Sequence, residues 1–137
     1  MNKPLLRVED LHVEFATYGG TVHAVRGVSF DVNAGETLAI VGESGCGKSV
    51  TVQSLMGLIP MPPGQITQGS AKLMGHDILS SKFIDGQDIR GNKVSMIFQD
   101  PMTSLNPTMN IGSQIAETLE VHRGYSRRNS RSKCSEC

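Results

Sequence analysis

The stretch LAIVGESGCGKSV, residues 38–50, constrains what this chain can fold into more than any other part of the sequence. The run TLAIV at 37–41 is continuously apolar, which is typical of a strand buried on both faces. A glycine-rich loop follows, and KSVTVQSLMGLI then predicts a helix that starts near Lys48. We expect the apolar face of this helix to comprise Val52, Leu55, Met56 and Ile59. The sequence therefore predicts a strand, a loop and a helix in direct succession.

The loop at residues 42–49 satisfies the pattern G-x-x-x-x-G-K-[ST] in full. Glycines let the backbone curl so that successive N–H groups point at phosphate oxygens, and the following helix adds its N-terminal N–H groups and dipole. Lys48 supplies a positive charge for the β- and γ-phosphates, and the Ser49 hydroxyl completes a Mg²⁺ coordination shell. A glycine-rich turn without a ligand is the alternative. The buried strand before the loop and the helix after it favour a loop that holds a nucleoside triphosphate.

The rest of the chain predicts further strands and one more helix. Alternating apolar and polar residues indicate strands at 5–15 and 21–32, and glycines punctuate a shorter strand pair at 64–79. KVSMIFQD at 93–100 predicts a second buried strand. IGSQIAETLEVHRG, which begins at residue 111, predicts a helix. The apolar face of that helix is expected to include Ile111, Ile115 and Leu119.

Composition and charge narrow the class of protein. Thirteen basic and thirteen acidic residues give a formal net charge of zero, which argues against a nucleic-acid partner, because such proteins usually carry a basic excess. The sequence has no apolar run of about eighteen residues that would span a bilayer. Its first residues lack the apolar core of a secretory signal, so we expect a cytoplasmic, soluble protein. Cys134 and Cys137 form a single CxxC pair, either an accident of a polar tail or half of a zinc site, which would need four ligands.

Two longer stretches carry a resemblance to a known family. VHAVRGVSFDVNAGETLAIVGESGCGKSV and, about fifty residues later, MIFQDPMTSLNPTMNIGSQIAE resemble the ATP-binding subunits of ABC-type importers for dipeptides and oligopeptides. Nickel importers of the same subfamily are similar. The resemblance covers residues 5 to about 126, and FQDPMTSLNP is its most specific phrase.

The resemblance implies roles for individual residues. Phe15 stands where the family places an aromatic ring against the adenine, although it also suits the core of the sheet, and Tyr18 is the less favoured substitute. Gln99 matches the family's Q-loop glutamine, a catalytic residue that reaches Mg²⁺ and the attacking water. Ser49 and Gln99 would thus be the metal ligands. The residues expected to contact ATP are Phe15, Gly42, Glu43, Ser44, Gly45, Cys46, Gly47, Lys48, Ser49 and Val50.

The resemblance also implies partners and a location. Members work with membrane permease subunits, a second ATP-binding subunit and an external solute-binding protein. They are cytoplasmic and peripheral on the inner face of the cell membrane when assembled. No nucleic acid is expected, and the cofactors are ATP and Mg²⁺. Which solute is transported is left open, because the membrane and binding subunits select it.

Several parts of the family's pattern have no counterpart in this sequence. No LSGGQ-like signature, Walker B strand with its catalytic Glu, or switch histidine is present. We therefore expect the chain alone not to hydrolyse ATP at a useful rate. The strands that would flank 37–41 are also missing, which predicts exposed apolar edges. The alternatives are a non-catalytic nucleotide-binding or regulatory protein, or a non-functional truncated remnant.

The expected fold is α/β, a P-loop nucleotide-binding domain of ABC type that is truncated. It would place an antiparallel β-subdomain beside a partial parallel core. Residues 1–125 would form the N-terminal part of the domain. The end of the chain, 126–137, contains SRRNSRSKCSEC, which has no large apolar residue and predicts a disordered tail. A shift of reading frame near codon 129 is the interpretation that accounts best for this change of composition.

Overall fold

A computed structural model describes residues 3–80, 90–100 and 102–134, except the side chains of Arg131 and Cys134. The chain divides into two compact units, Met1–Asp85 and Gly86–Cys137. Each unit is described by itself below.

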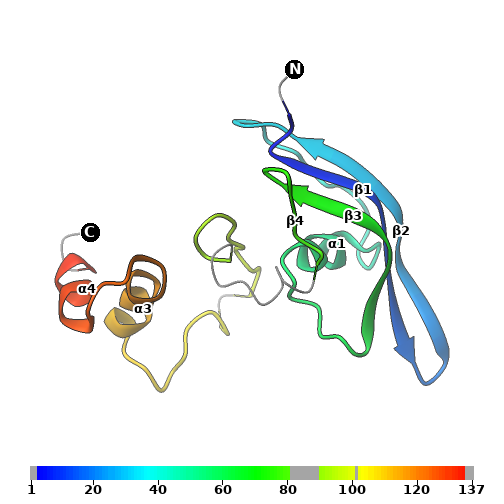
Figure 1. The fold of residues 1–137 in the computed structure, drawn as a ribbon. Coiled ribbons are helices and arrows are strands. Elements are labelled where there is room, and N and C mark those ends of the chain that lie inside the picture. The colour runs from blue at the N-terminus through cyan, green and yellow to red at the C-terminus, as the bar shows by residue number, and fades with distance from the viewer. Residues whose placement is uncertain (1–2, 81–89, 101, 135–137) are drawn as a thin grey trace. The chain divides into compact units, whose positions relative to one another are not determined.

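The first unit is built on a four-stranded antiparallel sheet (Figure 1). Its strands are β1 (Leu6–Thr17), β2 (Gly20–Val32), β3 (Gly64–Leu73) and β4 (His76–Asp77). The order across the sheet is β2-β1-β3-β4, so β1 lies between its hairpin partner β2 and the later strand β3. The strands predicted at 5–15 and 21–32 and the shorter strand pair are thereby confirmed.

A β-bulge in β1 decides which of its residues are buried. Between Val8 and Leu11 the strand has one residue more than the opposed stretch of β2, and Asp10 at the bulge has a positive φ of 49°. The extra residue shifts the alternation by one position. Leu11 and Val13 therefore return to the face that also buries Val8, and all three side chains are almost fully removed from solvent.

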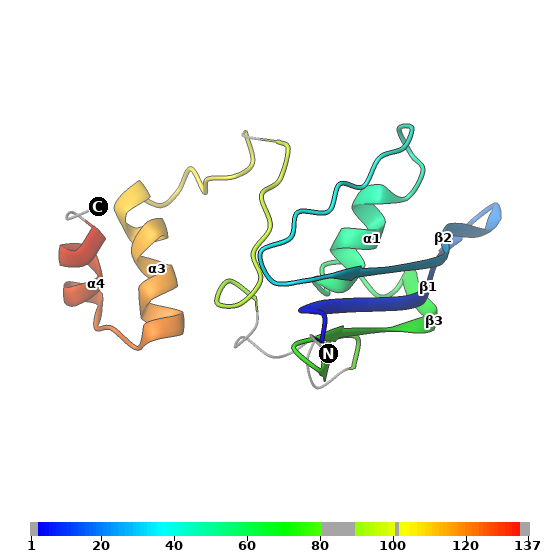
Figure 2. The ribbon, with the colours of Figure 1, turned by 90° about the horizontal axis from the view of Figure 1, so that it is seen from above.

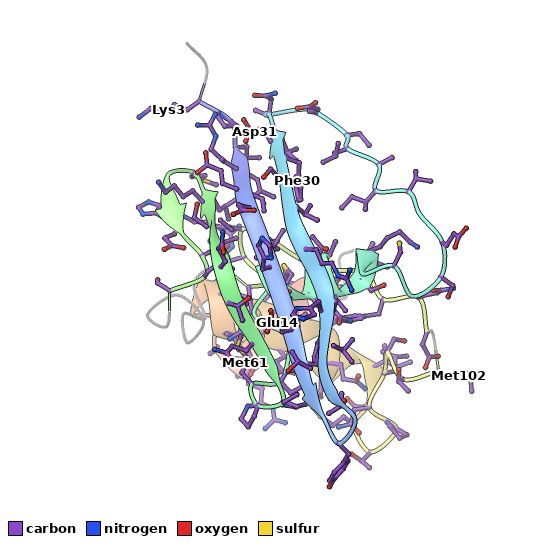
Figure 3. The ribbon with its side chains drawn as sticks, turned by 90° about the vertical axis from the view of Figure 1, so that its right-hand side faces the viewer. Lys3, Glu14, Phe30, Asp31, Met61 and Met102 are labelled. Atoms are coloured by element: carbon purple, nitrogen blue, oxygen red, sulfur yellow. The ribbon has the colours of Figure 1, made fainter. Side chains whose placement is uncertain are left out.

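Figure 3 marks Glu14 on β1, whose carboxylate lies 2.8 Å from His23 Nδ1.

Helix α1 (Lys48–Leu55) lies against one face of this sheet and contacts β1 and β2 (Figures 1 and 2). Its buried residues are Thr51 and Ser54, whose hydroxyls donate to the carbonyls of Gly47 and Val50 at 2.9 and 2.6 Å. Small hydroxyl side chains let the helix approach the sheet, and the hydrogen bonds to the preceding turn satisfy their polar atoms. The helix was predicted correctly, but its apolar face was not. Of the four residues expected there, only Ile59, beyond the helix end, is buried.

The two predicted core strands are not formed in the described residues. Residues 37–41 have no regular structure, and Val41 is 90% exposed. Residues 93–100 contribute only an isolated bridge between Arg90 and Val94, and Ile97 is 97% exposed. A strand buried on two faces needs pairing strands and covering layers, and the described residues supply neither. The two predicted core strands are therefore absent from the described residues, whereas the antiparallel sheet of the predicted fold is present. Apolar side chains at 37–41 are exposed without forming the edges of a strand.

The second unit contains two helices, α3 (Ile111–Arg123) and α4 (Arg127–Cys134), which pack against each other. The Asn110 side chain caps α3 by accepting from the Ser113 N–H at 3.3 Å, and Gly124 ends the helix in a left-handed conformation. Helix α3 was predicted. Its buried residue, however, is Ala116, while Ile111 and Ile115 of the expected face are exposed.

Helix α4 occupies most of the segment for which the sequence predicted disorder. Ser130 is fully buried there, and its hydroxyl and N–H both bond the Ser126 carbonyl, each at 2.9 Å. Short polar side chains therefore allow this segment to pack without any large apolar residue, and the structure gives a helix over 127–134 where the sequence predicts disorder. Residues 135–137 lie outside the described part of the chain. Neither this helix nor any other among the described residues is long and apolar enough to cross a membrane.

Candidate functional site

The glycine-rich loop at 42–49 leads directly into α1 and has the backbone shape of a curled loop. Gly45 and Gly47 have positive φ angles of 79° and 89°, and Cys46 N–H donates to the Glu43 carbonyl at 3.4 Å. Such left-handed positions turn successive N–H groups toward the inside of a loop. Cys46 is a free, exposed thiol.

Gly47 joins the loop to the sheet and to the helix at once. It is the N-cap residue of α1, and its carbonyl accepts the Thr51 N–H at 2.9 Å. A Cβ at this position would lie 2.3 Å from the carbonyl oxygen of Ala24 in β2, so the loop backbone rests directly on the strand. Because glycine has no side chain to cap the helix, and no acidic residue stands in the first turn of α1, the first N–H groups of α1 are left for an anion.

The Lys48 ammonium lies across the loop. Its Nζ donates to the carbonyls of Gly42 and Glu43 at 2.6 and 2.5 Å and contacts Cys46 Sγ at 3.6 Å. A Cβ at Gly42 would approach the same sulfur to 2.6 Å, so the start of the loop is also closely packed. These contacts hold one positive charge where the glycines and the helix N-terminus converge. This arrangement fits a polyphosphate anion.

The remaining predicted loop residues are more open. Glu43 and Ser44 are exposed, as is Ser49 on the first turn of α1, and Val50 is half-buried. A hydroxyl one residue after the lysine, exposed at a helix N-terminus, has the donor chemistry that Mg²⁺ accepts. The loop therefore fits the ATP and Mg²⁺ that the sequence predicts.

Phe15 lies on β1 and is half-buried, paired with Val22 on one side and Gly64 on the other. A Cβ at Gly64 would meet the Phe15 ring at 3.1 Å, so the ring covers this glycine of the sheet. The sequence left two roles open for Phe15, packing in the sheet and stacking on adenine. The structure shows the packing, and the stacking stays a prediction. Tyr18 lies in the β1–β2 turn and is fully exposed.

Gln99 is exposed and belongs to the second unit, so its proximity to the phosphate loop also stays a prediction. Side-chain hydrogen bonds join described residues that follow it in the sequence. Asp100 accepts from the Met102 N–H at 2.9 Å and from the Thr103 hydroxyl at 3.2 Å. Gln114 of α3 then braces the end of the loop, since its amide donates to the Asn106 and Met109 carbonyls and accepts from the Asn106 N–H.

Sequence reasoning did not foresee two of these features. The Ala24 carbonyl is a backbone atom, so no residue type in the sequence marks it as the support of Gly47. Gln114 is one amide among several polar residues of α3, and nothing in the helical pattern singles it out as a brace. Within the described residues no group of three or more metal-binding side chains occurs.

Comparison with known proteins places these features in a family context. A family profile described as ABC transporter matches residues 25–135. The oligopeptide transport ATP-binding protein OppD of Bacillus subtilis is 52% identical over 132 residues, which is 96% of this chain and 37% of the relative. The dipeptide transport ATP-binding protein DppD of Bacillus subtilis is 56% identical over 93% of this chain and 38% of the relative. The dipeptide transport ATP-binding protein DppD of Lactococcus lactis is 53% identical over 96% of this chain and 38% of the relative.

The extent of these matches bears on the predicted domain boundary. This chain spans less than two fifths of the length of each of these three relatives. The family profile reaches past residue 125 into the segment that the sequence assigns to a frame-shifted tail. That boundary and the frame shift stay predictions.

Proposed function

Since this chain belongs to the ABC transporter family, we propose that it binds ATP and Mg²⁺ through residues 42–49 as the nucleotide-binding part of a peptide importer. The observation that carries the proposal is the position of the Lys48 ammonium, bonded to the Gly42 and Glu43 carbonyls at the uncapped start of α1. The phosphates would be held by the loop N–H groups and Lys48. Ser49 and Gln99 would hold the metal. Bound Mg²⁺ neutralises phosphate charge.

The transported solute is proposed from the relatives. Three of them are named as oligopeptide or dipeptide transport ATP-binding proteins, at 52–56% identity. We propose import of dipeptides or oligopeptides, together with membrane permease subunits, a second ATP-binding subunit and an external solute-binding protein. In that assembly the chain is cytoplasmic and peripheral on the inner face of the membrane. Nickel stays the alternative solute.

We also propose that this chain by itself binds ATP without hydrolysing it at a rate useful for transport. Lys48, Ser49 and Gln99 have the chemistry to position triphosphate and metal, but an amide is a poor acceptor for a proton of the attacking water. Phosphoryl transfer further needs stabilisation of the charge that develops in the transition state. The sequence contains no LSGGQ-like signature and no apolar run ending in Asp-Glu to supply these groups.

Titration with a fluorescent ATP analogue tests the binding proposal. Lys48→Ala is expected to weaken binding roughly 10- to 100-fold, because it removes a charge-assisted contact to the phosphates. Lys72→Ala removes the same charge from an exposed position on β3 and is expected to leave the affinity unchanged. Equal affinity of the Lys48 variant and the parent chain would remove the loop from the site.

A steady-state phosphate-release assay tests the second proposal and separates the alternatives. Turnover on the order of 1 per second, lost in Lys48→Ala, would contradict a chain that only binds. Stoichiometric binding without turnover is expected, and it also describes a non-catalytic regulatory protein. Insolubility, or unfolding without a cooperative transition, would instead favour the non-functional remnant.

A further inference from the structure

The zero net charge of this chain conceals a strong separation of charge along the sequence. Residues 1–120 carry eight basic and twelve acidic side chains, whereas residues 121–137 carry five basic and one acidic, Glu136. The five are Arg123, Arg127, Arg128, Arg131 and Lys133. Such an asymmetry within one chain points to an anionic partner for the basic end.

These charges lie on one continuous segment, residues 121–134, which runs from the end of one helix through a turn into the next helix. We call this segment the basic hairpin. It comprises the last turn of α3, the left-handed Gly124 and the whole of α4. The N–H groups of Gly124 and Tyr125 both bond the Leu119 carbonyl, which fixes where α4 departs. Because Ser130 is fully buried, α4 is held against the rest of its unit.

Four charged side chains of the basic hairpin are described, and they face solvent. Arg123, Arg127, Arg128 and Lys133 are all exposed. None of the four makes an ion pair with another described residue. Arg127 and Arg128 moreover stand in the first turn of α4, where no acidic residue is present and the helix dipole disfavours cations. A negatively charged surface beside this turn would offset that cost.

Apolar groups are exposed among the same charges. Val121, two residues before Arg123, is 52% exposed, and Tyr125 lies between Gly124 and the first arginine of α4 with 39% exposed. Basic side chains together with exposed aliphatic and aromatic groups are the combination that binds at a lipid–water interface. A nucleic-acid backbone would match the charges but would leave Val121 without a partner.

We propose that the basic hairpin binds the surface of a bilayer that contains anionic lipids. Clusters of four to eight lysines and arginines bind such surfaces, and each residue near the surface strengthens binding roughly fivefold. Val121 and Tyr125 add apolar contacts at the headgroup level. This inference does not depend on nucleotide binding, since the hairpin and the phosphate loop belong to different units.

Co-sedimentation of the full chain with vesicles tests the proposal. Binding is expected to vesicles of phosphatidylcholine mixed with phosphatidylglycerol and not to phosphatidylcholine alone. It should weaken as the salt rises from about 0.01 to about 0.15 M, because the screening length falls from about 30 to about 8 Å. The double variant Arg127→Gln/Arg128→Gln should bind roughly 25-fold more weakly, two factors of five. Arg127→Lys/Arg128→Lys, which keeps the charge, should bind like the parent.

A matched control removes two exposed charges from the other unit. Arg26→Gln/Lys72→Gln gives the same net charge as the test variant and should bind vesicles like the parent chain. Val121→Ser/Tyr125→Ser should weaken binding to anionic vesicles several-fold, and circular dichroism checks that every variant keeps its helices.

Three results would overturn the proposal. The first is equal binding to neutral and anionic vesicles, and the second is an equal loss in the control and test variants. The third is tighter binding to a mixed-sequence single-stranded oligonucleotide than to anionic vesicles, which would assign the charges to a nucleic acid. ATP affinity measured on the same preparations reports on the phosphate loop alone, so failure of one proposal is distinguishable from failure of the other.

Discussion

Gly47 is the residue of the phosphate loop whose identity the surrounding structure restricts most. Its φ of 89° is open to glycine and costly for residues with a Cβ. The position of that missing Cβ is also filled, since the Ala24 carbonyl oxygen would lie 2.3 Å from it. Conformation and space therefore act together at one position.

Replacing Gly47 by alanine is expected to destabilise the first unit. Left-handed conformation and backbone collision together should cost roughly 2–4 kcal/mol. Gly35→Ala is the matched control, because Gly35 has a similar φ of 75° but open space around it. Its cost should stay at about 1 kcal/mol. Urea unfolding of both variants measures the difference, and equal midpoints would show that the contact with Ala24 contributes nothing.

Glu36 stabilises the turn that leads from β2 toward the loop. Its carboxylate accepts from the backbone N–H of Asn33 at 2.7 Å and from the Asn33 side chain at 2.8 Å. These bonds, the backbone one first, hold the pKa of Glu36 below the ordinary glutamate value of 4.5. A carboxylate whose pKa is lowered on folding contributes stability above its unfolded pKa and loses it as the pH falls through the folded value.

We therefore expect the parent chain to have a higher free energy of unfolding than Glu36→Gln at about pH 7. This difference should vanish well below pH 4.5. Carboxyl NMR titration gives the pKa directly. In Asn33→Ala the pKa of Glu36 should rise only part of the way toward 4.5, since the backbone donor is retained. An unshifted pKa in the parent chain would contradict the turn geometry.

Among the elements, the strands of the sheet were predictable because alternation marks them directly. The bulge at Asp10 was not, although it decides that Leu11 and Val13 share a face with Val8. An extra residue changes the phase of the alternation without any mark in residue type. For α1 and α3 the sequence predicts the helices themselves, but which residues are buried depends on what covers them. Thr51, Ser54 and Ala116 are buried because small side chains permit close packing.

The buried face of the β1–β2 strand pair is expected to dominate the stability of the sheet. Val13→Ala, at a site with 0% exposure, should cost roughly 2–3 kcal/mol through lost burial and the cavity left behind. Val22→Ala removes the same two methyl groups from β2 at a site that is 51% exposed, and should stay within about 0.5 kcal/mol. Thermal or urea unfolding compares them. Similar losses at both positions would mean that burial on this face of the sheet does not decide the stability.

The phosphate loop was predictable as a whole, because its motif fixes residue types at fixed spacing. Its location at the start of a helix from Lys48 is confirmed. What the motif does not contain is the support around it, namely the Ala24 carbonyl and the bonds of Lys48 to Gly42 and Glu43. Backbone partners leave no trace in a pattern of side chains.

At the scale of the whole molecule, large apolar side chains lie open to solvent in both units. Val41 in the first unit and Ile97 and Met102 in the second are each more than four fifths exposed. Residues 37–41 and 93–100 were predicted from their composition as buried strands. An apolar composition of this kind indicates that a segment is suited to burial between other strands and helices. The described residues do not provide those covering elements.

Such surface favours self-association. Ile97→Lys is expected to lower light scattering and the binding of a hydrophobic dye, because it places a charge beside the exposed Phe98. Tyr18→Lys adds the same charge at the fully exposed β1–β2 turn and should change neither signal, since a single exposed ring is ordinary. Equal effects of the two variants would attribute the change to net charge alone.

The contact between Gly47 and β2 also sets how the two positions can change over generations. The obstacle at position 24 is a main-chain carbonyl, which every amino acid carries, so no exchange of the side chain there makes room for a Cβ at 47. This contact therefore restricts position 47 to glycine and places no demand on the side chain at position 24. A suppressor of Gly47→Ala must therefore displace the backbone of β2 or of the loop, and a search for compensating pairs at 24 and 47 should return none.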